Sequence, residues 1–178
     1  MPHPRTAYDQ LELVAAHVAE LGLRSGDSCK GIAPSPLQGE RSREPGSRKP
    51  VVLVAEDNPA NRAFIEAVLT ALGVDAVAVS NGAAAVGVAT TRRFDAVLMD
   101  CYMPELDGPE ATMLIRRHEK TQRLAPVPVI ALTAAAMPND RTRCVEAGMN
   151  EFLAKPFNID YLQLLLRRVL PQFEVNFR

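Results

Sequence analysis

Five polar side chains follow short apolar segments of this sequence, and their chemistry is complementary. They are Glu56 and Asp57 after residues 51–55, Asp100 after 96–99, Thr133 after 127–132 and Lys155 after 152–154. Three carboxylates can together hold a divalent metal ion, and one of them can act as a nucleophile. A hydroxyl and an ammonium group beside them can bind and neutralise a phosphoryl group. If the fold brings these residues together, they point to phosphoryl transfer.

The apolar segments have the pattern of strands that are buried on both faces of a parallel sheet. Residues 96–99, for example, form a short run that lacks alternation and is bounded by turn residues. The carboxyl ends of parallel strands meet at one edge of the sheet, where open α/β folds bind ligands. We therefore expect the five polar side chains to converge on one edge.

Helical segments separate these strands. Asn58 and Pro59 can cap and begin a helix that Gly73 ends, and a further strand follows at residues 74–79. The other helices are predicted at residues 83–92, 109–118, 138–147 and 158–170. Five strand–helix units with short links predict a doubly wound α/β fold, with a five-stranded parallel sheet and five helices.

The first part of the chain differs in composition from the rest. Apolar residues recur at helical spacing over residues 7–23, which predicts a short amphipathic helix. Residues 25–50 carry prolines, glycines and serines among charges, which is typical of a disordered linker. We therefore divide the chain into this N-terminal segment (1–49), a domain at residues 50–172 and a tail at residues 173–178.

Composition argues against several classes of partner. The formal net charge is −1, so we expect no basic face and no nucleic-acid partner. No apolar run is long enough to span a bilayer, and the N-terminus lacks the layout of a signal peptide. Three cysteines cannot all pair, and we interpret Cys101 and Cys144 as small buried side chains. These features favour a reduced cytoplasmic protein with no membrane association.

Four segments together carry a specific resemblance. In chain order they are VVLVAEDNPANR, FDAVLMDCYMPELDG, VPVIALTA and NEFLAKPF. Over residues 51–170 the sequence resembles receiver domains of the two-component response-regulator superfamily. Its motifs are most similar to those of receivers of hybrid histidine kinases. This resemblance implies a flavodoxin-like sheet with strand order 2-1-3-4-5.

The resemblance also implies a magnesium site. In receivers of this kind the positions of Asp57 and Asp100 bind Mg²⁺ directly, and the position of Glu56 binds it through water. The backbone carbonyl of Tyr102 matches a further ligand. Mg²⁺ prefers hard oxygen ligands and keeps several waters, which suits this set.

The same resemblance assigns roles in phosphoryl transfer. Asp100 would be the nucleophile, Lys155 would offset charge on the phosphoryl oxygens, and Thr133 would donate a hydrogen bond to them. Phe152 matches an aromatic switch residue whose rotamer changes as the threonine moves. The peptide bond between Lys155 and Pro156 matches a cis bond in the family.

These roles predict a phosphoacceptor signalling protein that receives its phosphoryl group from a histidine kinase or a histidine phosphotransfer protein. We expect it to catalyse only its own phosphorylation and dephosphorylation. With eight residues after Leu170, we expect no C-terminal DNA-binding or enzymatic domain.

Two alternatives were weighed. A phosphatase of the haloacid-dehalogenase type also uses an aspartyl nucleophile, Mg²⁺, a threonine and a lysine. That family has a second acid two residues after its nucleophile, where this sequence has Tyr102, and the chain has no room for a cap domain. A scaffold that works without phosphorylation is disfavoured because no key residue is missing.

Overall fold

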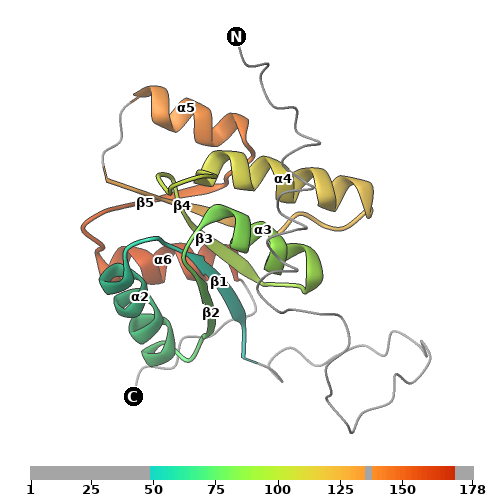
Figure 1. Ribbon diagram of the computed structural model, residues 1–178. Coiled ribbons are helices and arrows are strands. Elements are labelled where there is room, and N and C mark those ends of the chain that lie inside the picture. The colour runs from blue at the N-terminus through green and yellow to red at the C-terminus, as the bar shows by residue number, and fades with distance from the viewer. Residues whose placement is uncertain (1–48, 135–137, 171–178) are drawn as a thin grey trace, which may run out of the picture. The chain divides into compact units, whose positions relative to one another are not determined.

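The structure is a computed structural model, and it describes residues 49–134 and 138–170. Its strands are β1 (Val51–Ala55), β2 (Asp75–Val79), β3 (Ala96–Asp100), β4 (Val129–Thr133) and β5 (Glu151–Ala154). They form one parallel sheet in the order β2-β1-β3-β4-β5, which confirms the predicted topology (Figure 1). The predicted helix near residues 7–23, its linker up to residue 48 and the tail at residues 173–178 lie outside the described residues.

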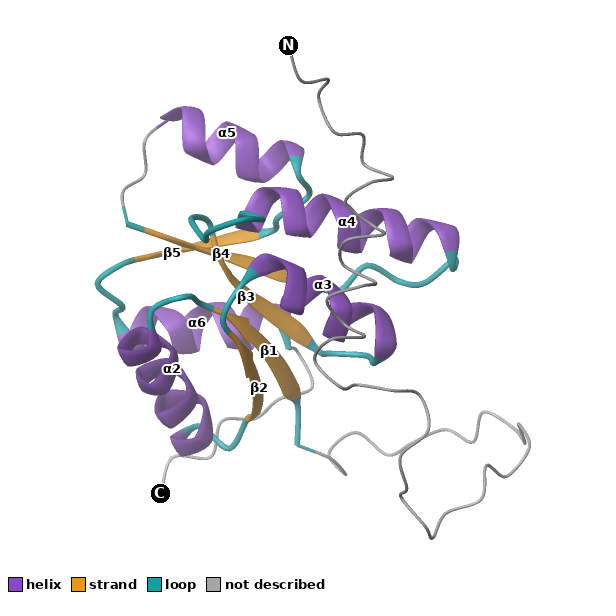
Figure 2. Cartoon of the chain, in the orientation of Figure 1, coloured by secondary structure: helices purple, strands orange, loops and turns teal. Residues whose placement is uncertain are grey.

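A helix follows each strand. The helices are α2 (Pro59–Ala71), α3 (Gly82–Thr91), α4 (Gly108–Thr121), α5 (Pro138–Glu146) and α6 (Ile159–Val169). Helices α2 and α6 cover one face of the sheet, and α3, α4 and α5 lie on the other (Figure 2). This three-layer arrangement is the predicted doubly wound fold. In the part of the chain that the structure describes, every helix is too short or too polar to span a bilayer.

The two central strands explain the missing alternation in the sequence. Every residue of β3 and β4 is buried, because helices cover both faces of the sheet there. On the face of α2 and α6, the core consists of strand residues Val52, Val54, Ala96, Leu98, Ile130 and Leu132 with helix residues Ile65, Leu69, Leu162, Leu165 and Leu166. These runs hold the carboxyl ends of β1, β3 and β4 together at one edge.

Two predicted boundaries were wrong by two or three residues. Helix α4 continues to Thr121, beyond the predicted 118, because polar residues in its last turn hid its end. Strand β4 begins at Val129 and not at Val127. The Val127 amide donates to the buried Glu119 carboxylate at 2.7 Å, and Pro128 has no amide hydrogen. Neither residue therefore donates to the ladder, although the Pro128 carbonyl accepts the Val97 amide at 2.8 Å.

One guanidinium group organises the edge of the sheet where β4 and β5 begin. Arg116 on α4 donates to the carbonyl oxygen of Gly148 at 2.9 and 3.1 Å and to Oδ1 of Asn150 at 3.1 Å. It also pairs with Glu119 at 2.7 Å. The same Asn150 oxygen accepts the Val129 amide at 2.8 Å. The first residue of β4 and the residue before β5 are therefore tied to one side chain of α4.

Candidate functional site

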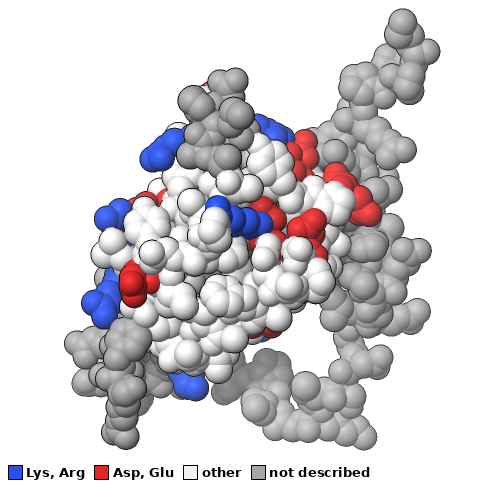
Figure 3. All heavy atoms as spheres, turned by 90° about the vertical axis from the view of Figure 1, so that its left-hand side faces the viewer, with Lys and Arg blue, Asp and Glu red and all other residues white. Residues whose placement is uncertain are grey.

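The three predicted acids lie together at the carboxyl edge of the sheet. Strands β1 and β3 are neighbours, with Ala55 opposite Met99, so the residues after β1 meet the end of β3. Carboxylate oxygens of Glu56, Asp57 and Asp100 all lie within 4.8 Å of one another. Figure 3 looks onto this side of the molecule, where acidic groups adjoin a basic side chain near the middle of the face.

Burial differs sharply among the acids. Glu56 is fully buried and Asp100 is 4% exposed, whereas Asp57 is exposed. Ionised carboxylates are costly to bury without compensating partners. Two of the three acids are therefore buried in the fold rather than solvated.

Lys155 compensates two of the carboxylates. It follows β5, and its Nζ lies 2.6 Å from Oδ2 of Asp100 and 2.7 Å from Oε2 of Glu56. The contact with Asp100 is a hydrogen bond, whereas the orientation toward Glu56 leaves Oε2 buried without a hydrogen bond. The Lys155–Pro156 peptide bond is cis, as predicted. The ammonium group is thus fixed between the two buried acids.

The pKa values of Asp100 and Lys155 depend on each other and on the nearby Glu56 carboxylate. Burial raises the pKa of Asp100 and Glu56 adds to this rise, while the hydrogen bond from Lys155 opposes it. Burial lowers the pKa of Lys155, but the hydrogen bond to Asp100 and the charges of Asp100 and Glu56 outweigh burial, so the net shift is upward. The lysine therefore stays cationic, and a further cation near Asp100 would favour its ionised form.

Thr133 and Phe152 lie on the two strands beyond Asp100. Thr133 ends β4 and is 6% exposed, and its carbonyl oxygen accepts the Lys155 amide at 2.7 Å. Phe152 on β5 is half-buried, and the guanidinium of Arg141 on α5 lies 4.5 Å from its ring centroid. The sheet thus places Thr133 on the strand next to Asp100, and Phe152 on the following strand in contact with α5.

The loop after Asp100 is fixed by close backbone packing. The amide of Tyr102 donates to Oδ1 of Asp100 at 3.3 Å, and its ring is half exposed. Gly108 begins α4 so close to β3 that a Cβ there would lie 2.1 Å from the carbonyl oxygen of Asp100. Burial raises the pKa of the neighbouring Cys101 thiol well above its usual range. Only glycine fits at position 108.

Sequence reasoning missed two residues that hold the first acid pair. Asn61 donates to Oε1 of Glu56 at 3.0 Å, and Arg62 donates to the Glu56 carbonyl at 2.8 Å. Both lie in the first turn of α2, whose start at Asn58 and Pro59 was predicted. A helix that begins directly after an acid pair turns its first polar side chains back toward that pair. The predicted start of this helix could therefore have indicated both contacts.

A second missed contact joins two helices. Asp107 caps α4 and forms a capping box with Glu110, and its other oxygen pairs with Arg143 on α5. This ion pair raises the pKa of the Arg143 guanidinium. The two partners are 36 residues apart, so no local pattern indicated it. It links the loop after Asp100 to α5.

The donor set fits a magnesium ion. Mg²⁺ takes hard oxygen ligands, and three carboxylates supply them here. Oε2 of Glu56 is buried and has the ion pair with Lys155 but no hydrogen bond, so it can still accept one from a water bound to a cation. The residues present therefore suit the ion that the sequence predicted.

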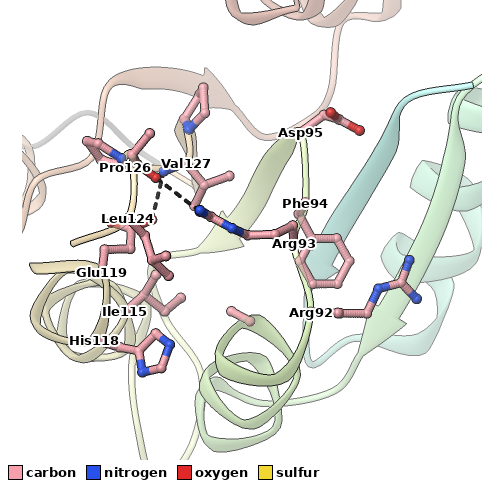
Figure 4. Close-up of a pocket in the computed structure, with 13 residues that line it drawn as sticks. Arg92, Arg93, Phe94, Asp95, Ile115, His118, Glu119, Leu124, Pro126 and Val127 are labelled. Atoms are coloured by element: carbon pink, nitrogen blue, oxygen red, sulfur yellow. Dashed lines mark hydrogen bonds between the residues drawn. The ribbon is translucent and has the colours of Figure 1, made fainter. Parts of the chain in front are cut away.

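A separate pocket of about 320 Å³ lies near the starts of β3 and β4, away from this site (Figure 4). Arg93 extends across it and donates to the Ala125 carbonyl at 3.4 Å, while His118 and Glu119 come from α4. None of the predicted site residues lines it. It brings no further chemistry to the acid cluster.

The comparisons with known proteins agree on one family. The family described as the response regulator receiver domain matches residues 52–167. The sensor histidine kinase GacS of Pseudomonas protegens is 39% identical over 127 residues, which cover 71% of this chain. The sensor histidine kinase RcsC of Escherichia coli is 34% identical over 116 residues, or 65% of this chain. The chain spans only 14% and 12% of the lengths of these two relatives.

Solved structures give the same picture. The receiver domain of a sensor histidine kinase from Pseudomonas aeruginosa is 47% identical, with a TM-score of 0.64 over 70% of this chain and 99% of that one. That crystal structure has a magnesium ion coordinated in its active site cleft. A Saccharomyces cerevisiae receiver domain is 31% identical, with a TM-score of 0.64 over 67% of this chain and 87% of that one. It was crystallised with its histidine phosphotransfer signaling protein.

Proposed function

This chain belongs to the response regulator receiver domain family, and from that premise we propose that it accepts a phosphoryl group from a phosphohistidine onto Asp100. The observation that carries the proposal is the placement of Lys155, whose Nζ lies within 2.7 Å of both buried acids. A buried nucleophile paired with a fixed cation suits a reaction in which negative charge arrives at that point.

The proposed reaction moves one phosphoryl group between two protein side chains. A carboxylate oxygen of Asp100 attacks phosphorus, the phosphorus–nitrogen bond of the phosphohistidine breaks, and the imidazole leaves with that electron pair. The carboxylate charge of Asp100 is lost in the new acyl phosphate. Lys155 then follows the charge to the phosphoryl oxygens, and the hydroxyl of Thr133 donates to one of them.

The ion we propose for this site is Mg²⁺, held by Asp57 and Asp100 directly, by Glu56 through water and by the backbone carbonyl of Tyr102. When bound, it would neutralise charge on the phosphoryl oxygens. The chain itself shields Glu56 from bulk solvent, and it fixes that carboxylate through Asn61. Water therefore approaches from the open side, beside Asp57.

The partner we propose is a histidine kinase or a histidine phosphotransfer protein. Asp100 is only 4% exposed, so a phosphohistidine has to approach past the exposed Asp57 and the half-exposed Tyr102. A convex helix bearing the histidine can present it at such an opening more readily than a deep pocket can. The S. cerevisiae complex shows that a receiver of this family binds such a protein.

We further propose that phosphorylation shifts Thr133 toward the phosphate and lets Phe152 move into the vacated space. Phe152 contacts Arg141 on α5, so its movement would change the surroundings of that helix. A hydrogen bond to a charged group contributes about 1.5–3 kcal/mol, which limits the shift in population to roughly ten- to hundredfold. The output is then a changed surface made by α5, β5 and α6.

The haloacid-dehalogenase alternative loses its support, because the chain belongs to the receiver family. The second acid of haloacid dehalogenases also has no counterpart here, since Tyr102 stands at that position. We propose residues 50–172 as the extent of the domain.

Phosphoramidate tests the proposal without a known partner, because it carries the same phosphorus–nitrogen bond. With Mg²⁺ the chain should gain one phosphoryl group by intact mass, and a chelator should prevent the gain. Asp100→Asn should remain unlabelled. Asp75→Asn removes an exposed acid at the start of β2 and should label normally. Labelling of Asp100→Asn at the wild-type level would refute the assignment.

A further inference from the structure

Two buried thiols lie beside the site and take no part in the chemistry proposed above. Cys101 directly follows Asp100 at the end of β3, and Cys144 lies on α5. Their Sγ atoms are 3.5 Å apart, although the residues are 43 positions apart in the chain. The side chains are 3% and 2% exposed, and they form no disulfide.

We propose that Cys101 and Cys144 form a redox modification site, which a peroxide converts to an intramolecular disulfide. A disulfide has an S–S distance of about 2.05 Å, so the sulfurs must approach by about 1.5 Å from their present contact. Rotation about the side-chain bonds and a small displacement of α5 can supply this. The fold thus holds two reactive groups of the right type at near-bonding distance.

The reaction balances with peroxide as the oxidant. The sulfur of one cysteine attacks a peroxide oxygen, the O–O bond breaks, and a sulfenic acid and water result. The second sulfur attacks the sulfenic sulfur, the S–S bond forms, the S–O bond breaks, and a second water leaves. Two electrons pass from the thiols to the peroxide. A dithiol reductant reverses the outcome by exchange.

Burial dictates the order of events. Peroxide reaches these sulfurs only when α5 moves away from the end of β3. Helix α5 has nine residues, and one of its contacts with this loop is the ion pair between Arg143, which is 48% exposed, and Asp107. Exposed ion pairs are weak, so this pair adds little to the free energy needed for local opening of α5. Cys144 moves with the helix and is oxidised first, and Cys101 resolves it when the helix returns.

The bond would tether α5 to the residue that follows Asp100. This consequence, unlike the bond itself, rests on the proposed function. A tethered α5 cannot follow the movement of Thr133 and Phe152, so oxidation would suppress the response of α5 to phosphorylation. It would leave the acids and Lys155 in place.

The test uses the full chain with Cys29→Ser, so that only this pair can bridge. The protein is oxidised with hydrogen peroxide at a temperature where circular dichroism shows the native fold, and it is then denatured for alkylation. Both thiols should resist alkylation in the denatured protein. Peptide mapping should join position 101 to position 144, and dithiothreitol should restore two alkylatable thiols. Native protein in which both thiols stay alkylatable, or in which either becomes sulfinic acid, overturns the proposal.

A second measurement asks whether the fold promotes the bond. In glutathione redox buffers, the equilibrium constant for the disulfide should be at least about tenfold larger in native protein than in urea. A ratio of one or less overturns the proposal, because proximity in the fold would then contribute nothing. The added Cys144→Ala control should give no bridge in either state. Phosphoramidate labelling is measured separately, so a failure of the proposed function leaves both readouts intact.

Discussion

Replacing Asp57 should stabilise the metal-free protein and remove its response to Mg²⁺. The three carboxylates lie within 4.8 Å of one another, and only Glu56 and Asp100 have the contact with Lys155. At this separation two like charges repel by about 3.5 kcal/mol at an effective dielectric constant of about 20. Because Asp57 is exposed, solvent screening reduces this to a net effect of about 1 kcal/mol.

In Mg²⁺ the same substitution should be unfavourable, because it removes a ligand of the ion. A ligand at ten times its dissociation constant stabilises the native state by about 1.4 kcal/mol, which raises the melting temperature of a domain of this size by about 3–6 °C. Wild type should show this rise, and Asp57→Asn should lose most of it. The assay is thermal unfolding followed by circular dichroism, in EDTA and over a series of Mg²⁺ concentrations.

Asp75→Asn is the matched control, because it removes one exposed carboxylate at the start of β2. It should leave both the metal-free melting temperature and the Mg²⁺ response near those of wild type. Metal-free Asp57→Asn that melts at or below wild type would refute the charge repulsion. A gain from Mg²⁺ as large as that of wild type would mean that Asp57 does not bind the ion.

Three further predictions follow from the site and the sequence. Thr133→Ala should keep the labelling of Asp100 but lose the amide NMR shifts of α5 and β5 on binding beryllofluoride; equal shifts in both proteins would contradict the switch. Gly108→Ala should cost about 1–3 kcal/mol and slow labelling, because its Cβ would strike the Asp100 carbonyl. Gly73→Ala meets no neighbouring atom, so strain at its φ of 75° should lower stability by about 1 kcal/mol and leave the labelling rate unchanged. A protein that begins at Lys49 should melt within a few degrees of full length and label at a similar rate, and insoluble protein would contradict the domain boundary.

The alternation of strands and helices and the location of the acids could be predicted because they depend on local patterns, whereas the strand order came from the resemblance to the family. The run at residues 96–99 identified a buried central strand, and the carboxyl ends of such strands share one edge. The full burial of Glu56 could not be predicted in this way. An acid next to Asp57 has the pattern of a solvated turn, and its burial depends on Lys155, which comes from the other end of the domain.

Contacts between distant elements were also beyond the sequence. The ion pair between Asp107 and Arg143 and the contact between Cys101 and Cys144 both depend on where α5 lies over the sheet. Alternation of strands and helices predicts that α5 exists and which face it covers. It does not specify its translation along that face, which decides the side chains that meet.

The contacts of Arg116 predict which substitutions far from the acids should impair the protein. Strand β5 has four residues, and its register with β4 decides where Phe152 and Lys155 lie relative to Thr133. A slip of one residue would turn Phe152 to the opposite side of the sheet. Arg116 and Asn150 prevent the slip from the far edge. A screen for alleles that abolish signalling should therefore recover substitutions at these two positions. Their phenotype should be that of a substitution at Asp100, the proposed phosphoacceptor, although neither residue lies near it.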